Sequence, residues 1–341
     1  MLCRMLRFLC LALLTLLLCQ KEALSQTVGD RLPWRTRMDD WSMTGRMAFW
    51  FGGKETDPPR AREHLYSFDF GTSSVSRVLD DAEENRLLQS ASHLDASLDG
   101  RMVALTGWVK ELRAGSNRIL LLDAASRQVR VLVSNERNNI FPRFSPDGRE
   151  VAFYSSDPDM QRNNWDLFHT KGFALSVVDV ATSAIRQLAH EDWRLMRDGP
   201  PSWSPDGKYV AYSAMYDQKE TWQIYIVPSS GGESRRVSPP GAKACSRPVW
   251  LNGDTMLYYA NTGVHGPGLY VVRRDGTGDR LLFRGAVSTT PDASADGQKI
   301  CFMGVSLDSR DLTRDGLVVL DLSGRTLPGP RPDIMLHKWR R

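Results

Sequence analysis

The sequence predicts an all-β protein in which one four-stranded unit is repeated six times. The first observation is a recurring turn, which is clearest at residues 144–148 (FSPDG) and 203–207 (WSPDG). The second is the position of the turn glycines, which stand at 45, 100, 148, 207, 253 and 297. The third is that apolar residues after position 25 occur in short runs without helical periodicity. A period of about 40–50 residues with four strands per repeat is typical of a propeller. We therefore expect a six-bladed β-propeller with four antiparallel strands per blade.

The residue types of the turn explain why it recurs between the first and second strands of each unit. Proline presets φ at the second position of a turn, Ser and Asp form local hydrogen bonds, and glycine adopts the left-handed conformation. An apolar run follows each turn, as in 151–154 (VAFY) and 209–212 (YVAY). Weaker copies of the turn lie at 41–45, 96–100, 250–253 and 293–297.

A second apolar run and a short fourth strand complete each unit, for example 175–179 (LSVVD) followed by 185–188 (IRQL). The outer strand of the sixth unit is reduced to a short segment at 325–327, because Pro328 and Pro330 interrupt it. We expect the propeller to span residues 39–327 and a tail to span 328–341. Residues 26–38 form either a strand that closes the ring beside the last unit or a loose N-terminal arm.

Residues 1–25 have the composition of a signal peptide. Arg4 and Arg7 form a basic start, residues 8–18 form an apolar run, and small residues at 23–25 offer a cleavage site before Gln26. We therefore expect an exported protein, periplasmic or secreted. The alternatives that would place it on a membrane are an uncleaved anchor and a lipid on Cys19, although Leu18 stands where a bacterial lipidation motif has a small residue.

The charge balance argues against nucleic acid as a partner. The whole chain carries a net charge of +4. The signal segment accounts for +2 of it through Arg4, Arg7, Lys21 and Glu22, which leaves only +2 for the mature chain. Two cysteines remain after cleavage, Cys245 and Cys301, and their spacing predicts no disulfide. We expect a monomer.

The longest connections join the second and third strands of the units, so one face of the disc is elaborated. Aromatic and arginine residues, the types that dominate protein-binding hot spots, fall in or beside these connections. The binding candidates are Trp108, Arg162, Trp165, Tyr216, Trp222 and Arg247. Some of the aromatic residues are alternatively caps over the unit cores. The connection at 156–172 is the longest of the six. We therefore expect the binding surface to lie above units 3 and 4. The expected partner is a protein or a glycan.

The same loop is rich in oxygen-bearing side chains, including Asp157 and Asp159, which we include among the binding candidates. Alternating oxygen ligands resemble the start of a calcium loop, but the glycine and terminal glutamate of an EF-hand are missing. A solvated polar loop is the better interpretation. The six histidines show no metal-ligand spacing, and His93, just before an inner strand, is the weak candidate. We expect no cofactor, with Ca²⁺ or another divalent ion at Asp157, Asp159 or His93 as the alternative.

The turn repeats, together with 231–238 (GGESRRVS), resemble the TolB-like or PD40 propeller family over roughly residues 39–327. The resemblance implies the fold rather than an activity, since propellers host unrelated functions. The periplasmic TolB protein carries an α/β domain before its propeller, and only residues 26–38 intervene here. Prolyl-oligopeptidase relatives add a hydrolase domain with a Gly-x-Ser-x-Gly elbow, which this sequence does not contain. The resemblance therefore implies a stand-alone exported propeller.

Two functions follow as hypotheses. The first is a non-enzymatic scaffold that binds a protein or another ligand, because the sequence shows no acid–base, nucleophile or metal motif. The second is a lyase or hydrolase acting on a carbohydrate or peptide in the central funnel. Oligogalacturonate lyases, which have similar propellers, hold a metal with histidines on one face. Whether the protein is an enzyme is left open by the sequence, and the first hypothesis is the one we favour.

Overall fold

The structure is a computed structural model that describes most residues of the chain. The described residues are 34–35, 41–43, 47–54, 64–69, 74–79, 91–107, 117–156, 173–189, 194–195, 199–215, 221–263, 266–287, 290–293, 297–306 and 316–325. They form only strands and turns, so no helix that could cross a membrane occurs among them. The predicted all-β class is confirmed.

The first three repeat units each contribute consecutive antiparallel strands to one sheet. Unit 1 contains β1 (Trp34–Arg35), β2 (Trp41–Met43), β3 (Met47–Lys54), β4 (His64–Asp69) and β5 (Ser74–Arg77). Unit 2 contains β6 (Ala91–Ala96), β7 (Met102–Gly107), β8 (Arg118–Asp123) and β9 (Val129–Val133). Unit 3 contains β10 (Asn138–Phe144), β11 (Glu150–Ser156), β12 (Ala174–Asp179) and β13 (Ile185–Ala189).

The remaining units follow the same order. Unit 4 contains β14 (Arg194–Leu195), β15 (Ser202–Trp203), β16 (Tyr209–Met215), β17 (Gln223–Pro228) and β18 (Arg235–Arg236). Unit 5 contains β19 (Lys243–Trp250), β20 (Thr255–Gly263), β21 (Gly266–Arg273) and β22 (Arg280–Val287). Unit 6 contains β23 (Asp292–Ala293), β24 (Lys299–Ser306) and β25 (Gly316–Asp321).

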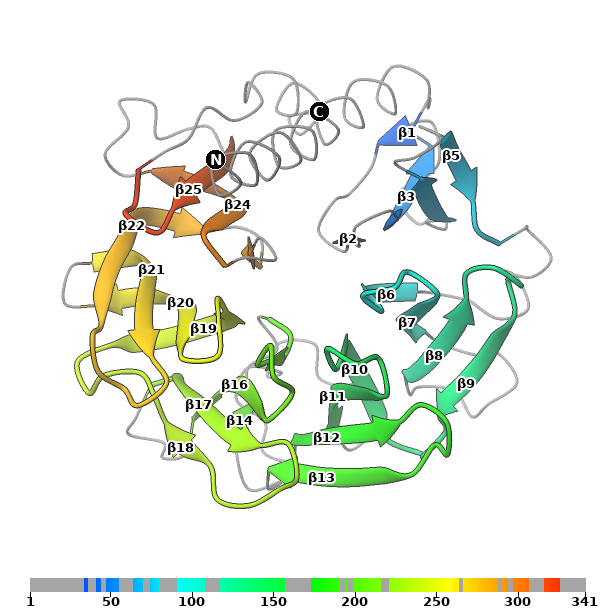
Figure 1. Ribbon diagram of the computed structural model, residues 1–341, viewed down its shortest axis with the longest axis horizontal. Coiled ribbons are helices and arrows are strands. Elements are labelled where there is room, and N and C mark those ends of the chain that lie inside the picture. Colours follow the sequence, from blue (N-terminus) through cyan, green and yellow to red (C-terminus); the bar gives the residue numbers. More distant parts are fainter. Residues whose placement is uncertain are drawn as a thin grey trace, which may run out of the picture.

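The sheets stand around a common centre, and β2, β6, β10 and β19 lie on the inner side of their units (Figure 1). This is the propeller arrangement. Strand β22 pairs with β21 and then with β24, so units 5 and 6 share one seven-stranded sheet. At the other end, β1 pairs with β3 through Trp34 and Lys54 and lies within unit 1. Residues 1–33 and 326–341 lie outside the described part, so the signal segment, the tail and the manner of ring closure stay predictions, as does the count of six blades.

The repeated turn has the hydrogen bonds that its residue types predict. In unit 3 the Ser145 hydroxyl donates to Asp147 Oδ1 at 2.6 Å and accepts from the Glu150 amide at 3.0 Å. Gly148 has a φ of 72° and donates its amide to the Ser145 carbonyl at 2.9 Å. The turn of unit 4 repeats these contacts with Ser204, Asp206 and Gly207. A side chain at such a φ is strained, which explains the glycine.

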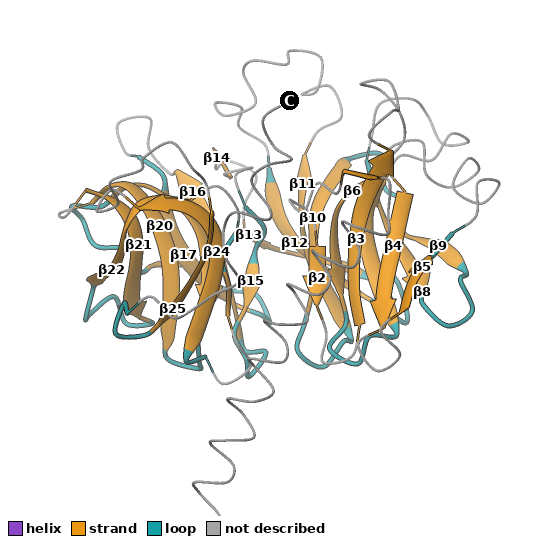
Figure 2. Cartoon of the chain, turned by 90° about the horizontal axis from the view of Figure 1, so that it is seen from above, coloured by secondary structure: helices purple, strands orange, loops and turns teal. Residues whose placement is uncertain are grey.

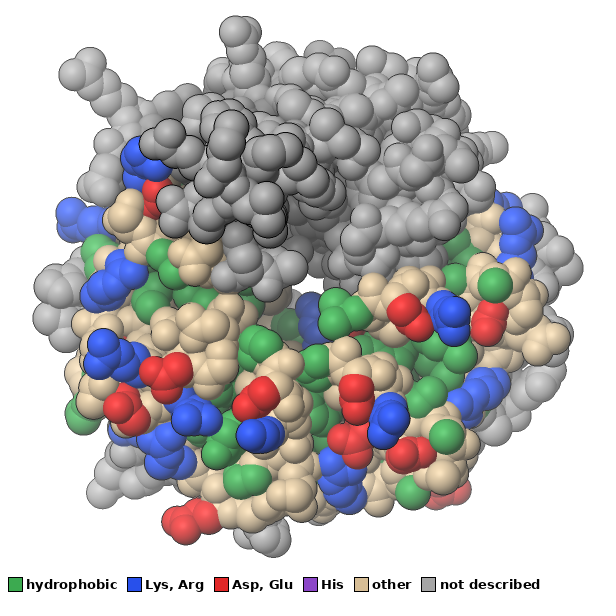
Figure 3. All heavy atoms as spheres, viewed as in Figure 1, with side chains coloured by type: hydrophobic (Ala, Val, Ile, Leu, Met, Phe, Trp, Pro, Cys, Tyr) green, Lys and Arg blue, Asp and Glu red, His purple; other side chains and the backbone are tan. Residues whose placement is uncertain are grey.

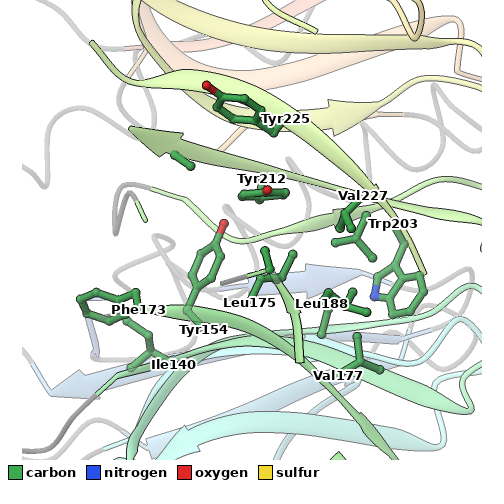
Figure 4. Packing of buried hydrophobic residues seen from close by; sticks show 14 residues of the cluster. Ile140, Tyr154, Phe173, Leu175, Val177, Leu188, Trp203, Tyr212, Tyr225 and Val227 are labelled. Atoms are coloured by element: carbon green, nitrogen blue, oxygen red, sulfur yellow. The ribbon is translucent and has the colours of Figure 1, made fainter. Parts of the chain in front are cut away.

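The core lies between neighbouring sheets rather than within a single unit. Figure 4 shows Tyr154 and Leu175 of unit 3 facing Tyr212 of unit 4, and all three are 1 % exposed or less. Rings of one unit also stack, as Tyr258 does on Tyr270 at 5.6 Å between ring centroids. Cys245 is a free thiol buried between units 4 and 5, and burial raises its pKa to about 12. Each such side chain contributes about 1.5–3 kcal/mol by burial, so packing between units holds the ring together.

Arginines on the outer strands link each of four units to the next. They occupy one register position, pairing with Leu121, Val177, Ile226 and Val271 of the third strands. Each guanidinium donates to a backbone carbonyl just beyond the third strand of the following unit. The pairs are Arg130 with Val180, Arg186 with Ser229, Arg235 with Arg274, and Arg280 with Leu322. We call these four contacts the arginine latches.

The two faces of the disc differ in the connections that they carry. The short turns after the first and third strands gather along one face, seen as the lower rim in Figure 2. We call this the short-turn face. The predicted long connections leave the opposite ends of the strands, for example after Ser156 and before Asn117. We call that side the long-loop face.

Candidate functional site

Most of the predicted binding residues lie outside the described part of the chain. Trp108 falls in the segment 108–116, and Tyr216 falls in 216–220. Asp157, Asp159, Arg162 and Trp165 all fall in the segment 157–172. Their role in binding therefore stays a prediction. The structure describes Trp222, Arg247 and the weak metal candidate His93.

Trp222 and Arg247 lie close together in the chain trace where units 4 and 5 meet. Trp222 is half-buried and directly precedes β17. Its carbonyl accepts a hydrogen bond of 2.8 Å from the amide of Cys245, which stands two residues before Arg247 on β19. The sequence does not indicate that these two residues lie in one sector. The hydrogen bond from Cys245 to Trp222 brings them there.

Arg247 and His93 occupy equivalent β-bulges on innermost strands, and Phe141 occupies a third. The pairing register shifts between Ser92 and Leu94 in β6, between Ile140 and Arg143 in β10, and between Ser246 and Val249 in β19. The residues at the three bulges have positive φ values of 50° for His93, 58° for Phe141 and 54° for Arg247. For bulky side chains this conformation costs of order 1–3 kcal/mol. Bulges of this kind redirect a side chain, and they are frequent beside functional sites.

The side chains of His93, Phe141 and Arg247 are half-buried, and each contacts a residue on a neighbouring strand. The ring of His93 lies 3.9 Å from that of Phe141, measured between centroids, and Phe141 meets Tyr154 edge-on at 6.3 Å. The guanidinium carbon of Arg247 lies 6.0 Å from the centre of the Tyr259 ring, and its Nη1 donates at 2.5 Å to the carbonyl of Val287, the last residue of β22. Units 2 and 3 thus meet at the bulges of His93 and Phe141.

Asp95 and Arg143 stand on the inner strands two positions after the bulge residues His93 and Phe141. Arg143 of unit 3 forms a 3.0 Å ion pair with Asp95 of unit 2, and both side chains are partly exposed. The other Asp95 oxygen accepts from the Phe144 amide at 2.8 Å. In Figure 3 hydrophobic side chains and a basic side chain border the lower side of a hollow near the centre of the ring, while acidic and basic side chains alternate farther out.

Sequence reasoning missed the bulges, although the sequence contains a partial signal. Phe141 precedes Pro142 and Arg247 precedes Pro248, each three residues before the last residue of its inner strand. A residue before proline is restricted in conformation, and proline within a strand indicates an edge or a bulge. His93 precedes Leu94, so its bulge has no such signal.

Arg118 is a second feature that sequence reasoning missed. It begins β8 and is 3 % exposed. Its guanidinium donates to the carbonyls of Asn135 and Arg137, in the link from unit 2 to unit 3, and its Nε has no hydrogen-bond partner. Burial away from water lowers the pKa of Arg118. Gln223 occupies the equivalent start of β17 and donates to the Ala242 carbonyl at 2.8 Å in the next link.

A metal site is not assembled by the described residues. They contain no group of three or more His, Cys, Asp or Glu side chains able to hold a metal ion. His93 instead contacts the Phe141 ring. The segment with Asp157 and Asp159 lies outside the described part, so a divalent ion there stays a prediction.

Comparison with known sequences gives one limited match. No family model matches the chain. A protein named uncharacterized peptidase YuxL, from Bacillus subtilis (strain 168), is 25 % identical over 125 residues. The match covers 36 % of this chain and 17 % of that protein, so the chain matches only a small part of the relative's length.

Solved structures match over most of the chain. Oligogalacturonate lyase from Vibrio parahaemolyticus matches with a TM-score of 0.63 and 15 % identity, covering 87 % of this chain and 78 % of the lyase. TolB from Acinetobacter baumannii matches with a TM-score of 0.58 and 16 % identity, covering 83 % of this chain and 62 % of TolB. At these identities the likeness shows the fold alone. The resemblance to TolB-like β-propellers that the turn motifs predict is therefore confirmed at the level of the fold.

Proposed function

We propose that the protein is an exported propeller that binds a protein or glycan partner through its long-loop face and the adjoining inner strands β6, β10 and β19. The observation that carries this proposal is the set of three strained bulges at His93, Phe141 and Arg247. A conformation that lowers stability at equivalent places in three units is best explained by a gain in function.

The proposal includes the finer expectations drawn from the sequence. The surface is centred above units 3 and 4, and the residues that contact the partner are Trp108, Asp157, Asp159, Arg162, Trp165, Tyr216, Trp222 and Arg247. The protein acts as a monomer in the periplasm or outside the cell, without nucleic acid and without a cofactor. Its release from the membrane depends on cleavage after Ser25, which the intact mass of the mature protein would report.

The experiment uses the mature chain as bait under native conditions, followed by titration of the identified partner. Trp165→Ala and Tyr216→Ala should each weaken binding by about 1–2 kcal/mol, roughly 5- to 30-fold in Kd, as truncated hot spots do. Their unfolding midpoints should change little, because a loop side chain contributes little to the core. Lys208→Ala is the control, since Lys208 is exposed on the short-turn face. Loss of binding in the control with none in the loop variants would assign the partner to the opposite face.

A lyase or hydrolase is the second candidate function. It is supported by the names of two matches, oligogalacturonate lyase and a peptidase, which share the fold or part of the sequence. Purified protein that contains Mn²⁺ or Ca²⁺, and loses it in His93→Ala or Asp157→Asn, would favour the enzyme over the scaffold.

A further inference from the structure

The turn of unit 5 departs from the Ser-Pro-Asp-Gly pattern of units 3 and 4. It reads Leu251-Asn252-Gly253-Asp254 and connects β19 to β20. The sequence contains no other asparagine that is followed by glycine. Asn252, Gly253 and Asp254 are all exposed to solvent. In such a pair the asparagine side chain can react with the following backbone amide, because glycine places no side chain beside the attacking nitrogen.

Two backbone amides hold the carbonyl oxygen of the Asn252 side chain. Asn252 Oδ1 accepts from the Asp254 amide at 2.9 Å and from the Thr255 amide at 2.8 Å. Attack on Cγ moves negative charge onto Oδ1, and preorganised amide donors at this distance stabilise such an oxyanion. The same bonds restrain the side chain next to its own backbone, so less rotational freedom is lost on ring closure.

The attacking group is the amide nitrogen of Gly253, and its surroundings leave it accessible. Among the described residues, no backbone hydrogen bond of the turns is donated by the Gly253 amide. A methyl group at Gly253 would meet no atom of the described residues within 4 Å, apart from the adjoining residues of the chain. There is therefore room in the folded protein for a five-membered ring and for water.

Two other asparagines share some of these conditions but not all of them. Asn135 Oδ1 also accepts from the amide two residues further on, that of Arg137 at 3.3 Å, but Glu136 follows it in the chain. Asn261 is exposed, but it lies within the paired strand β20 and Thr262 follows it. A side chain on the following residue hinders ring closure, so both asparagines serve as internal comparisons.

An aspartate at position 252 fits a motif that this protein already uses in other turns. Asp123 Oδ1 accepts from the amides two and three residues further on, at 3.0 Å and 2.7 Å. Asp179 Oδ1 does the same, at 3.0 Å and 2.7 Å. The amide three residues further on is the main cause that holds the pKa of each carboxyl below its usual value. Asn252 makes the same pair of contacts, so a carboxylate there keeps the turn.

The isomeric product, isoaspartate, does not fit the turn. It carries the main chain through the side-chain carbon and adds one methylene between residues 252 and 253. The Leu251 amide donates to the Thr255 carbonyl at 2.9 Å. The Leu251 carbonyl lies so close to Gly297 of unit 6 that a β-carbon at Gly297 would come within 1.8 Å of it. A longer turn displaces these contacts where units 5 and 6 meet.

We propose that Asn252 is a modification site of the folded protein, at which the Asn-Gly turn converts itself to aspartate or isoaspartate with water as the co-reactant. The Gly253 nitrogen gives up its proton and bonds to Cγ of Asn252, and the Cγ–Nδ2 bond breaks. Ammonia leaves with that proton, and a succinimide ring remains. Water then breaks one of the two ring bonds to the nitrogen. Cleavage at Cγ gives aspartate, cleavage at the main-chain carbonyl carbon gives isoaspartate, and either product adds one negative charge.

Peptide mapping of the purified, folded protein after incubation at neutral pH tests the proposal. Trypsin releases residues 244–273 as one peptide that contains both Asn252 and Asn261, because Pro248 protects the bond after Arg247. Mass spectrometry locates the residue whose amide has become a carboxylate, and chromatography separates the two products. We expect conversion at Asn252 to be about tenfold faster than at Asn261 or Asn135, which corresponds to about 1.4 kcal/mol in the barrier.

Gly253→Ala is the matched variant, because its φ lies outside the left-handed region and the added methyl group meets no neighbour, yet this group hinders attack on Cγ. Conversion should fall by about tenfold while the unfolding midpoint stays unchanged. Asn252→Asp represents the aspartate product and should unfold at the native midpoint.

Three outcomes would overturn the proposal. The first is an equal rate at Asn252 and Asn261 in the folded protein. The second is an unchanged rate in Gly253→Ala. The third is conversion of Asn252 in urea but not in the folded protein, since the fold would then protect the residue rather than hold it ready for reaction.

Discussion

At the scale of single residues, the first position of the third strand makes the same kind of hydrogen bond in two units, through Arg118 in one and Gln223 in the other. Arg118 and Gln223 begin the third strands of units 2 and 4, and both donate to carbonyls of the link that follows. The arginine performs this task as a buried cation, and desolvation lowers its pKa while the charge of Glu136 acts in the opposite direction. A neutral amide fulfils the same hydrogen-bonding role without that penalty.

Arg118→Gln should therefore leave the free energy of unfolding within about 1 kcal/mol of the native value, because the link carbonyls keep a donor. Arg118→Ala should lower it by about 1–3 kcal/mol, because it removes the donor and leaves a cavity. Urea unfolding followed by tryptophan fluorescence measures both. Equal losses in the two variants would show that the charge itself, rather than the hydrogen bonds, is needed.

At the scale of elements, the arginine latches explain how separate sheets are joined on their outer side. The strongest of them is Arg186. Its Nη2 donates to the Ser229 carbonyl at 2.6 Å and to Glu150 Oε2 at 3.0 Å, and its Nη1 pairs with the other Glu150 oxygen. The hydrogen bond that Arg186 donates to the Glu150 carboxylate raises the pKa of Arg186. The planar guanidinium serves one carboxylate and one carbonyl at once, which a lysine cannot do.

Arg186→Lys should consequently destabilise the protein by about 1–2 kcal/mol, despite keeping the charge. Arg235→Lys is the matched control, because Arg235 occupies the same register position but is exposed and donates to the Arg274 carbonyl. Its effect should stay within about 0.5 kcal/mol. Chemical denaturation of both variants provides the comparison. A larger loss in the control would contradict the ranking of the latches by burial and bidentate geometry.

At the scale of the whole molecule, aspartates in the short turns set the response to acid. Hydrogen bonds from Ser97, Ser145 and Ser204 lower the pKa values of Asp99, Asp147 and Asp206 respectively. Backbone or hydroxyl donors do the same for the acids that end the third strands or stand in the turns after them, namely Asp123, Asp179, Asp275 and Asp321. Because these pKa values are lower in the folded protein, the stabilisation is present above the unfolded value and is lost as pH falls through the folded values.

The urea midpoint should therefore decrease as pH is lowered below about 4, where unfolded aspartate begins to bind protons. In Asp147→Asn the decrease should be smaller than in the native protein, since one contributor no longer titrates. Unfolding curves at pH 7, 5 and 3 provide the measurement. A midpoint that is unchanged at pH 3 would show that these turn carboxylates contribute no differential stability.

The sequence by itself determined the parts of the fold that depend on neighbouring residues. The Ser-Pro-Asp-Gly turn is local chemistry, and its hydrogen bonds around Ser145 and Gly148 are those that the residue types predict. Alternating short apolar runs likewise predict strands, whose order follows the chain in the sheets of units 2 and 3. The all-β propeller class followed from these signals because a repeated local pattern can build only a repeated architecture.

Only the tertiary structure decided which residues meet across units. The contacts of Arg186 with Ser229, of Asn139 with Asn117, and of His93 with Phe141 join residues that are 22 to 48 positions apart. No local pattern fixes such pairs, because they depend on how the sheets stand beside one another. The bulges illustrate the same limit: Pro142 and Pro248 hint at two of them, whereas the positive φ of His93 emerges only from the pairing of β6 with β7.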